Sequence, residues 1–278
     1  MAHELKFASP SFGKRLKGML GVDFYRLFHT PLYYIFLAIA AIIPAMVSCL
    51  TMMPDQNGNV MEPLYSNVWQ IIAASEPLYV IRSISDYANM NMVFIFGGIM
   101  VSIFIGHDYR SGYVKQLFTT HAKKVDYMLS KTISCAFAMV CMCASYFIGG
   151  TIGGLIAGYD TAVNVGSLLV AVFGKMILSL GWASLFTFIN VILRKQFGVS
   201  IASSFFFGTG ILIIGVAAVV EALSLPTAFL NMFLYGASVN ACLASGFGAF
   251  ITCIVVSLAW TLIYNLLGTW LLSRSDVY

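Results

Sequence analysis

Six stretches of this chain are nearly free of charged residues and long enough to cross a membrane as helices. A helix needs about 20 mostly apolar residues to span the hydrocarbon core, and an uncharged run of 18 or more is the usual signal. Only 9% of the residues are charged and 60% are hydrophobic, which excludes soluble globular, disordered and collagen-like chains. We therefore predict an all-α polytopic membrane protein with six transmembrane helices, in a single domain over 1–278. The predicted spans are Leu32–Met53, Ala88–Gly106, Thr132–Gly158, Ser167–Leu193, Val199–Val220 and Leu243–Leu272.

Two residues inside these runs affect the predicted shape of the spans. Pro44 removes one backbone donor, but neighbouring groups can satisfy the freed carbonyl, so it predicts a kink rather than a break. Lys175 costs about 2.5–3.5 kcal/mol if it lies at the centre of the bilayer. Either Lys175 lies in the bilayer, or residues 160–175 form a short re-entrant or interfacial piece before a span over Met176–Leu193. The insertion cost favours the second interpretation.

The positions of the basic residues predict the orientation of the spans. Lys and Arg are retained on the cytoplasmic side of membrane proteins. Thirteen of the 15 basic residues lie before the first span, between the second and third, between the fourth and fifth, or after the last, and only Arg82 and Lys175 lie elsewhere. Both termini are therefore predicted to be cytoplasmic.

Three segments outside the predicted spans have a pattern of their own. Residues 11–30 alternate Phe and Leu with Lys and Arg at helical spacing, which predicts a helix in the headgroup plane; the alternative is a cytoplasmic helix packed on protein. Residues 54–89 form a long external loop with aromatic residues suited to the outer interface. Residues 107–131 form a charged cytoplasmic loop with a helical pattern, which suits a soluble partner or, alternatively, lipid headgroups. A further external piece over 222–240 is a candidate for a return into the membrane.

Several kinds of chemistry have no support in the sequence. Neither Gly-Lys pair has the upstream Gly and following hydroxyl of a phosphate-binding loop, so no nucleotide site is expected in this chain. No dense basic face for nucleic acid is present. The six cysteines fall in or beside the spans, where a free Cys behaves as a small hydrophobe, so no metal or other cofactor is expected. The predicted spans are nearly free of ionisable groups, which disfavours a proton-coupled carrier.

Glycines recur at four-residue spacing in the third predicted span. Such small-residue faces allow two helix backbones to approach closely. The pattern predicts a tight helix contact, within the chain or across a dimer. The residues are Gly149, Gly150, Gly153, Gly154 and Gly158.

The loop after the second span carries the most specific pattern. It contains Asp108-Tyr109-Arg110-Ser111-Gly112-Tyr113-Val114-Lys115, followed by Lys123-Lys124-Val125-Asp126-Tyr127-Met128-Leu129-Ser130-Lys131. With the amphipathic entry helix and six spans, this pattern resembles the permeases of the ABC-2 transporter family. The chain departs from that family at His121-Ala122-Lys123-Lys124, where many members have a Pro and an Arg.

The resemblance implies a permease subunit of an ATP-driven exporter in the plasma membrane, without its own ATP or Mg site. Its expected partners are cytoplasmic ABC ATPase subunits, which hold ATP and Mg, and a second permease copy or paralogue. The expected substrates are antimicrobial peptides, antibiotics or lipid-like compounds. The alternative is a membrane accessory or sensory protein that docks a cytoplasmic partner without transport. The residues that the resemblance implies in coupling are Asp108, Arg110, Gly112, Lys115, Lys123, Lys124 and Lys131.

Overall fold

The computed structural model describes residues 11–50, 68–69, 91–119, 122–162, 165–194, 196–243 and 247–274. Every regular element in these ranges is a helix, which confirms the predicted all-helical class. The α-helices are α1 (Phe12–Phe28), α2 (Pro31–Leu50), α4 (Met92–Arg110), α5 (Tyr113–Thr119), α6 (Lys124–Ala157), α7 (Val165–Ile192), α8 (Phe197–Gly208), α9 (Ile211–Ala222), α10 (Leu234–Leu243) and α11 (Phe247–Arg274), with a 3-10 helix η2 (Thr227–Met232).

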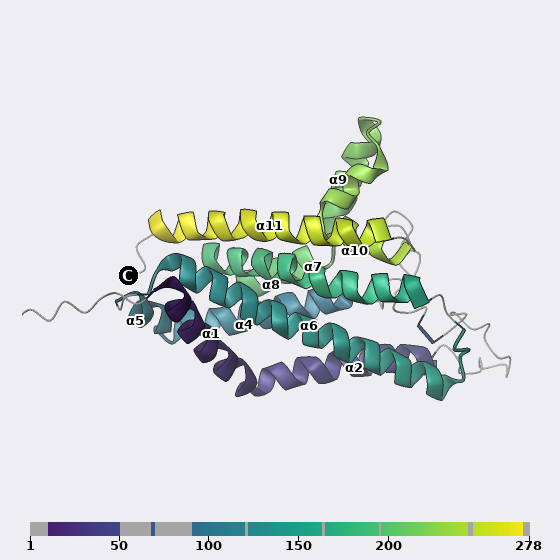
Figure 1. Cartoon of the computed structure of the whole chain (residues 1–278), viewed down its shortest axis with the longest axis horizontal. Helices are drawn as coiled ribbons and strands as arrows, with labels where there is room; N and C mark the ends of the chain where they lie inside the picture. The colour runs from purple at the N-terminus through teal and green to yellow at the C-terminus, as the bar shows by residue number, and fades with distance from the viewer. Residues whose placement is uncertain are drawn as a thin grey trace, which may run out of the picture.

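Five of the described helices, α2, α4, α6, α7 and α11, are long and apolar enough to cross a membrane. The pair α8 and α9 adds a sixth crossing if the two are counted as one bent span. The long helices run side by side, and α6 packs against both α2 and α7 (Figure 1). α2 continues through Pro44 without a break.

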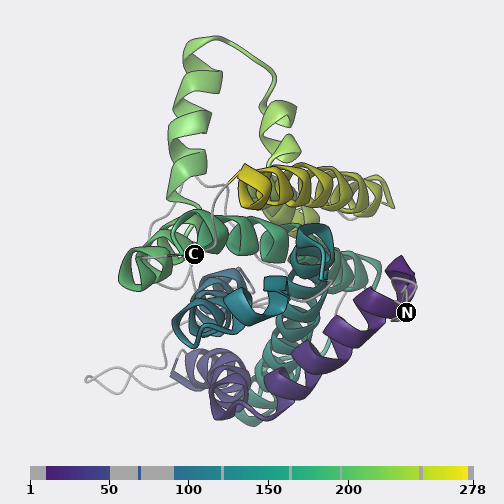
Figure 2. The ribbon, with the colours of Figure 1, turned by 90° about the vertical axis from the view of Figure 1, so that its left-hand side faces the viewer.

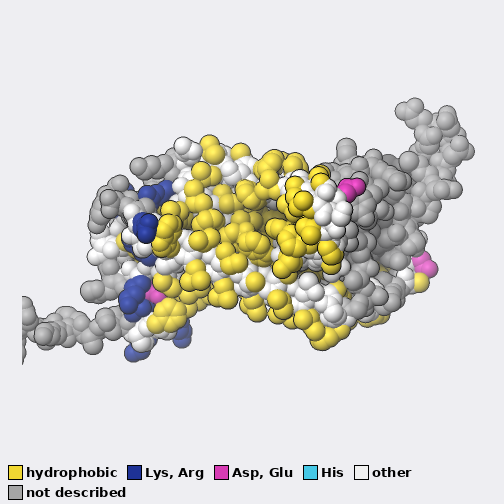
Figure 3. Space-filling model, turned by 90° about the horizontal axis from the view of Figure 1, so that it is seen from above, with side chains coloured by type: hydrophobic (Ala, Val, Ile, Leu, Met, Phe, Trp, Pro, Cys, Tyr) yellow, Lys and Arg dark blue, Asp and Glu magenta, His cyan; other side chains and the backbone are white. Residues whose placement is uncertain are grey.

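Apolar side chains cover the middle of the bundle, while Lys and Arg gather at one end. Figure 3 shows this division on one face, with the basic side chains at its left-hand end. Exposed Leu258, Leu262 and Leu266 of α11 recur at four-residue spacing, which is the pattern of a helix face turned to lipid. The start of α1 and the end of α11 lie at the same end of the bundle, on the left in Figure 1. We call this the basic end.

The helices extend beyond some of the predicted spans at the basic end. α6 begins at Lys124 rather than Thr132, and α4 continues to Arg110 rather than ending at Gly106. Hydropathy marks only the apolar part of a helix, whereas the backbone hydrogen bonds continue through the polar turns that follow. The predicted loop over 107–131 is therefore largely helical.

The fifth predicted span, Val199–Val220, is two helices in the structure, α8 and α9. α8 and α9 meet at an angle of 48°, and α9 leaves the bundle with η2 beside it (Figures 1 and 2). Gly210 between them has a φ of 73°, in the left-handed region that interrupts a right-handed helix. A Cβ built on Gly210 would overlap the ring of Tyr235, so glycine is required both for the turn and for the packing.

The chain after α9 returns to the bundle. η2 leads into α10, which packs against α7 and α11. The indole Nε1 of Trp260 in α11 donates to the carbonyl of Met232 at 2.8 Å and anchors the end of η2. The predicted external piece over 222–240 therefore contains η2, which lies beside α9, and most of α10, which packs on α7 and α11.

The prediction of a re-entrant piece over 160–175, followed by a separate span over Met176–Leu193, is wrong. α7 runs unbroken from Val165 to Ile192, and Lys175 lies within it with its side chain fully buried. The insertion cost refers to a Lys that faces lipid, whereas this one lies inside the protein. Ser179 one turn later donates its hydroxyl to the carbonyl of Lys175 at 3.0 Å.

α2 and α6 approach closely through two glycines. Cβ atoms built on Gly149 and Gly153 of α6 would overlap the backbone of Ala41 and Ala45 in α2, respectively. The four-residue spacing on both helices lets the two backbones lie against each other over one turn. This close contact lies within one chain.

The other glycines of the predicted face have different surroundings. Gly150 is buried, and Gly154 faces the side chain of Val68. Gly158 has a φ of 80° and ends α6 as a left-handed cap, with no atom within 4 Å of a built Cβ. It therefore ends the helix instead of packing against another one.

Among the segments predicted to lie outside the spans, residues 11–30 and 54–89 differ in how far the structure describes them. A helix, α1, forms over the predicted segment; it packs on α6 and leaves Phe12, Tyr25 and Phe28 exposed, so it has a protein-facing and an outer side. Most of the predicted loop over 54–89 lies outside the described residues. Within it, Trp69 donates its indole N–H to the hydroxyl of Thr151 at 3.0 Å.

Candidate functional site

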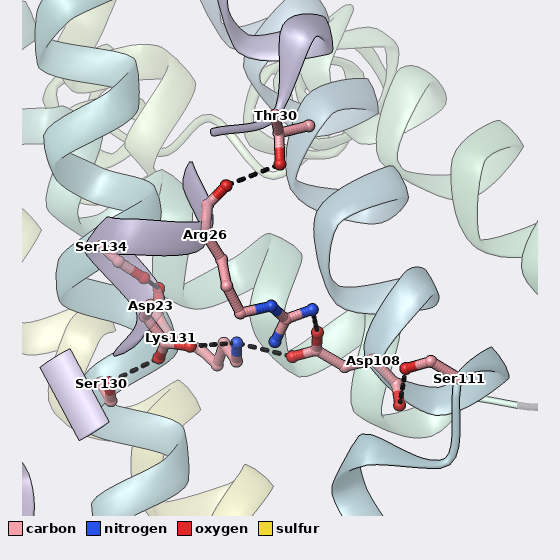
Figure 4. A network of polar contacts seen from close by, with 8 residues as sticks. All are labelled: Asp23, Arg26, Thr30, Asp108, Ser111, Ser130, Lys131 and Ser134. Atoms are coloured by element: carbon pink, nitrogen blue, oxygen red, sulfur yellow. Dashed lines mark hydrogen bonds and ion pairs between the residues drawn. The ribbon is translucent and has the colours of Figure 1, made fainter. Parts of the chain in front are cut away.

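A buried cluster of charges joins α1, α4 and α6 near the basic end (Figure 4). The Nζ of Lys131 lies 2.5 Å from Asp23 Oδ1 and 2.5 Å from Asp108 Oδ2. Arg26 Nη2 donates to the other oxygen of Asp108, and Ser130 Oγ donates to Asp23 Oδ2 at 2.6 Å. Asp23 and Arg26 come from α1, Asp108 from α4, and the remaining two from α6. We call these five residues the ionic cluster.

The ionic cluster balances two carboxylates with two cations away from water. Lys131 and Asp108 are fully buried, Asp23 is 2% exposed, and the side chain of Arg26 is 24% exposed and forms the outer edge. Burial lowers the pKa of Arg26, but the attraction of Asp108 and Asp23 outweighs it and raises the pKa above its usual value. Arg26 therefore stays charged, and every charge in the cluster has an opposite neighbour.

Aromatic rings surround the two cations of the ionic cluster. Lys131 Nζ lies 4.7 Å from the ring centre of Phe104, and the guanidinium carbon of Arg26 lies 4.6 Å from that of Tyr113. Ring faces attract cations and exclude water at the same time. The rings belong to α4 and α5, so they connect the cluster to the segment that follows α4.

A second ion pair ties α1 to the start of α6. Arg15 Nε donates to Asp126 Oδ2 at 2.7 Å, and the backbone N–H of Lys123 is 3.4 Å from the same oxygen. Asp126 lies in the first turn of α6, where a carboxylate also interacts well with the helix dipole. α1 is therefore attached to α6 at both ends of its inner face.

The residues predicted for coupling separate into a buried pair and an outer set. Asp108 and Lys131 lie inside the ionic cluster. Gly112, with a φ of 73°, forms the turn between α4 and α5. The outer residues are Arg110, Lys115 and Lys123, which are exposed, and Lys124, which is half-buried. Arg110 lies over the ring of Phe197 at 5.2 Å, and His121 of the same segment lies outside the described residues.

The short helix α5 carries Lys115 of this outer set and packs beside α4. Its Val114 is buried in a cluster with Tyr127 of α6, Val191 of α7 and Leu272 of α11. Its other side exposes Lys115 and Gln116. α5 contacts α4 and also α6, since the rings of Phe118 and Tyr127 pack edge to face with their centres 5.7 Å apart, so a force applied to the outer side of α5 acts on these two helices.

The role of α1 in the ionic cluster was not predicted from the sequence. Arg26 was placed with the basic residues on the polar face of the predicted headgroup-plane helix, and Asp23 was given no role. A signal for Asp23 does exist: it follows Leu16 and Leu20 and precedes Leu27 at three- and four-residue spacing, so it is an acid within the apolar stripe. Such an acid requires a buried partner.

Uncharged polar groups join α4, α7 and α8 inside the bundle. Asn190 Nδ2 donates to Ser102 Oγ at 3.0 Å, and Ser102 Oγ donates to Ser204 Oγ at 2.7 Å. Ser200 donates to the amide oxygen of Asn190. These hydrogen bonds between uncharged side chains hold α8 against α4 and α7.

Metal-binding geometry and cavities give further constraints. Among the described residues, no group of three or more His, Cys, Asp or Glu could hold a metal ion.

A cavity of about 380 Å³ lies beside α7 and α11 and is lined mostly by aromatic and aliphatic side chains. A second cavity, of about 330 Å³, lies between the α1–α2 turn and α4, and Arg26 forms part of its wall.

A scan of protein-family models finds none that matches this chain, and no curated protein matches its sequence. The class that the structure defines is an all-helical, multi-pass membrane protein, whose described residues include five helices long and apolar enough to cross a membrane and one bent pair.

Proposed function

We propose that this chain is the permease subunit of an ATP-driven ABC transporter, and that the basic end faces the cytoplasm. The observation that carries this proposal is the position of α5, which exposes Lys115 on one side and buries Val114 on the other, in a cluster that also includes residues of α6, α7 and α11. It lies in the segment whose sequence resembles the coupling region of ABC-2 permeases. An ATPase that binds and hydrolyses ATP would press on this side.

The ionic cluster contacts α5 through Tyr113 and joins the helices around it. It fixes α1 and α4 to α6 through Lys131 and Asp108, and Tyr113 at the start of α5 lies over Arg26. Movement of α5 would therefore shift α1, α4 and α6 together. In this proposal the outer set contacts the ATPase, whereas the buried pair positions the helices. ATP and Mg belong to the partner subunits.

The proposal extends to export from the cell across the plasma membrane. A second copy of the chain or a paralogue would complete the permease, and the substrate would be an antimicrobial peptide, an antibiotic or a lipid-like compound. The apolar cavity beside α7 and α11 suits apolar parts of such compounds.

Charge reversal on α5 tests the proposal. We expect Lys115→Glu to weaken retention of the ATPase subunit about fivefold, because an exposed ion pair contributes up to about 1 kcal/mol. The measurement is the amount of ATPase bound per permease after purification from the chain's native membranes, together with ATP hydrolysis by that complex in vesicles. The purified chain alone is expected to hydrolyse no ATP.

Arg274→Glu is the matched control. Arg274 is also an exposed cation at the basic end, but it lies on α11 and its guanidinium rests on Trp270 at 4.3 Å. It should leave ATPase retention within about twofold of the unmodified chain. Transport by the chain with no ATPase present would overturn the proposal. Substrate flux that does not respond to ATP, in vesicles holding the chain and the ATPase, would favour an accessory or sensory protein instead.

A further inference from the structure

The cavity beside α7 and α11 has an unusually aromatic wall. Six of the twelve residues that line it are aromatic, against 14% of the whole chain. None of the described residues that line it carries a charge. The aromatic residues are Trp182, Phe207, Phe233, Tyr235, Trp260 and Tyr264.

Several of these rings contact one another in two kinds of arrangement. Trp260 lies next to Phe233 and Tyr264, with the ring planes 27° and 20° apart and the ring centres 6.2 and 5.2 Å apart. Tyr235 meets Trp182 edge to face, at 81° between the planes and 6.5 Å between the centres. Near-parallel and edge-to-face pairs are the two arrangements that aromatic rings prefer. The wall therefore offers a ring-shaped ligand both kinds of contact.

A ligand can reach this wall without unfolding it. Four of the six rings are partly exposed, namely those of Phe207, Phe233, Trp260 and Tyr264. The wall is also held in place, because the indole N–H of Trp260 donates to the carbonyl of Met232 at 2.8 Å. A site that is formed before the ligand arrives avoids the cost of ordering its side chains on binding.

The cavity lies at the point where the bend at Gly210 directs α9 away from the bundle (Figure 1). Ile213 and Val216 of α9 line one part of it, and α11 lines another. Trp260 is near the middle of α11, which is long and apolar enough to cross a membrane, and the neighbouring Leu262 is exposed. A compound dissolved in the apolar part of the membrane would therefore meet the cavity directly.

We propose that this cavity binds an uncharged aromatic compound in preference to a lipid acyl chain. A ring has a negative face and a positive edge, so an aromatic ligand is electrostatically complementary to a wall of rings, whereas a saturated chain gains only from burial. A charged group would find no counter-ion among the described lining residues. As a statement about the transported compound this inference rests on the proposed function, whereas the binding itself requires no ATPase.

Displacement of a fluorescent probe from the purified full-length chain tests this site. N-phenyl-1-naphthylamine is uncharged and aromatic, and it fluoresces more strongly in apolar surroundings. The competitors are naphthalene and decalin, which share a fused two-ring skeleton but differ because decalin is saturated. Their concentrations are corrected for partition into protein-free micelles of the same detergent. We expect naphthalene to displace the probe at about tenfold lower concentration, because two ring contacts together contribute about that factor.

A pair of neighbouring variants locates the probe. Phe207→Leu removes a ring from the wall, keeps an apolar side chain and should weaken probe binding about fivefold. Phe206→Leu is the matched control, because Phe206 is the next residue on α8 but is exposed and does not line the cavity. It should change binding less than about twofold. Tyr264→Leu, on α11, covers the case in which Phe207→Leu does not fold, and it should weaken binding to a similar extent.

Three outcomes would overturn the inference. Equal displacement by naphthalene and decalin would show an unselective apolar cavity, which an acyl chain could fill as well. An equal loss with Phe206→Leu would place the probe on the lipid-facing surface, and unchanged binding in folded Phe207→Leu and Tyr264→Leu would place it elsewhere on the chain.

The binding assay and the ATPase assay fail separately. A chain that retains the ATPase but does not prefer naphthalene would overturn this inference alone. A chain that prefers naphthalene but transports with no ATPase present would overturn the proposed function and support the aromatic site.

Discussion

Replacing Lys131 with methionine is expected to lower the melting temperature of the purified protein by about 10 °C. The change leaves Asp23 and Asp108 buried with one cation between them, whereas the unmodified chain has two. Removal of one partner from a buried ion pair costs about 3–5 kcal/mol. For a chain of this size each kcal/mol corresponds to about 2–4 °C. The measurement is the fraction of monodisperse protein left after heating in detergent.

Two further variants show whether the loss arises from unbalanced charge. Lys124→Met makes the same change on the same helix, at a half-buried position outside the ionic cluster, and should shift the melting temperature by less than about 2 °C. Adding Asp23→Asn to Lys131→Met restores the balance of one acid and one cation, and the asparagine can still accept from Ser130. It should recover at least half of the loss. A Lys131→Met protein as stable as the unmodified chain would show that the cluster does not hold these helices.

The ionic cluster also illustrates what spacing in one sequence can predict. The motif around Asp108 and Lys131 identified both residues as important, but it did not show that they contact each other and α1. Lys131 and Asp23 are 108 positions apart, and no local periodicity relates such residues. The partner on α1 was missed because a helix at the membrane interface was expected to turn its charges to water. Asp23 instead turns to α6.

The long helices were predictable because burial in lipid requires an apolar run and internally satisfied backbone groups. The bend between α8 and α9 was not, because Thr209 and Gly210 hardly change the average hydropathy of that run. Its cause is conformational: a left-handed glycine packed against Tyr235. The prediction about Lys175 failed for a related reason. Hydropathy treats every residue of a span as facing lipid and takes no account of the interior of a bundle.

The glycine spacing in α6, by contrast, was informative because it encodes a steric requirement. Replacing Gly153 with leucine is expected to abolish stable folding while leaving membrane insertion intact. Insertion depends on hydropathy, which leucine raises, whereas folding requires α2 and α6 to pack. The atoms of α2 that a side chain would meet at Gly153 belong to the backbone of Ala45, so they cannot move aside by a rotamer change. Two helix backbones would have to separate.

The expected result is an unchanged amount of chain in the membrane and at least a tenfold lower yield of monodisperse protein after extraction. Gly215→Leu is the control, because Gly215 also lies within an apolar helix but has no atom within 4 Å of a built Cβ. It should extract normally. Combining Gly153→Leu with Ala45→Gly separates two causes: if the leucine met only the methyl of Ala45, this trimming would rescue folding, whereas an overlap with backbone leaves the defect in place. Rescue by Ala45→Gly, or normal extraction of Gly153→Leu, would contradict a backbone-to-backbone contact between α2 and α6.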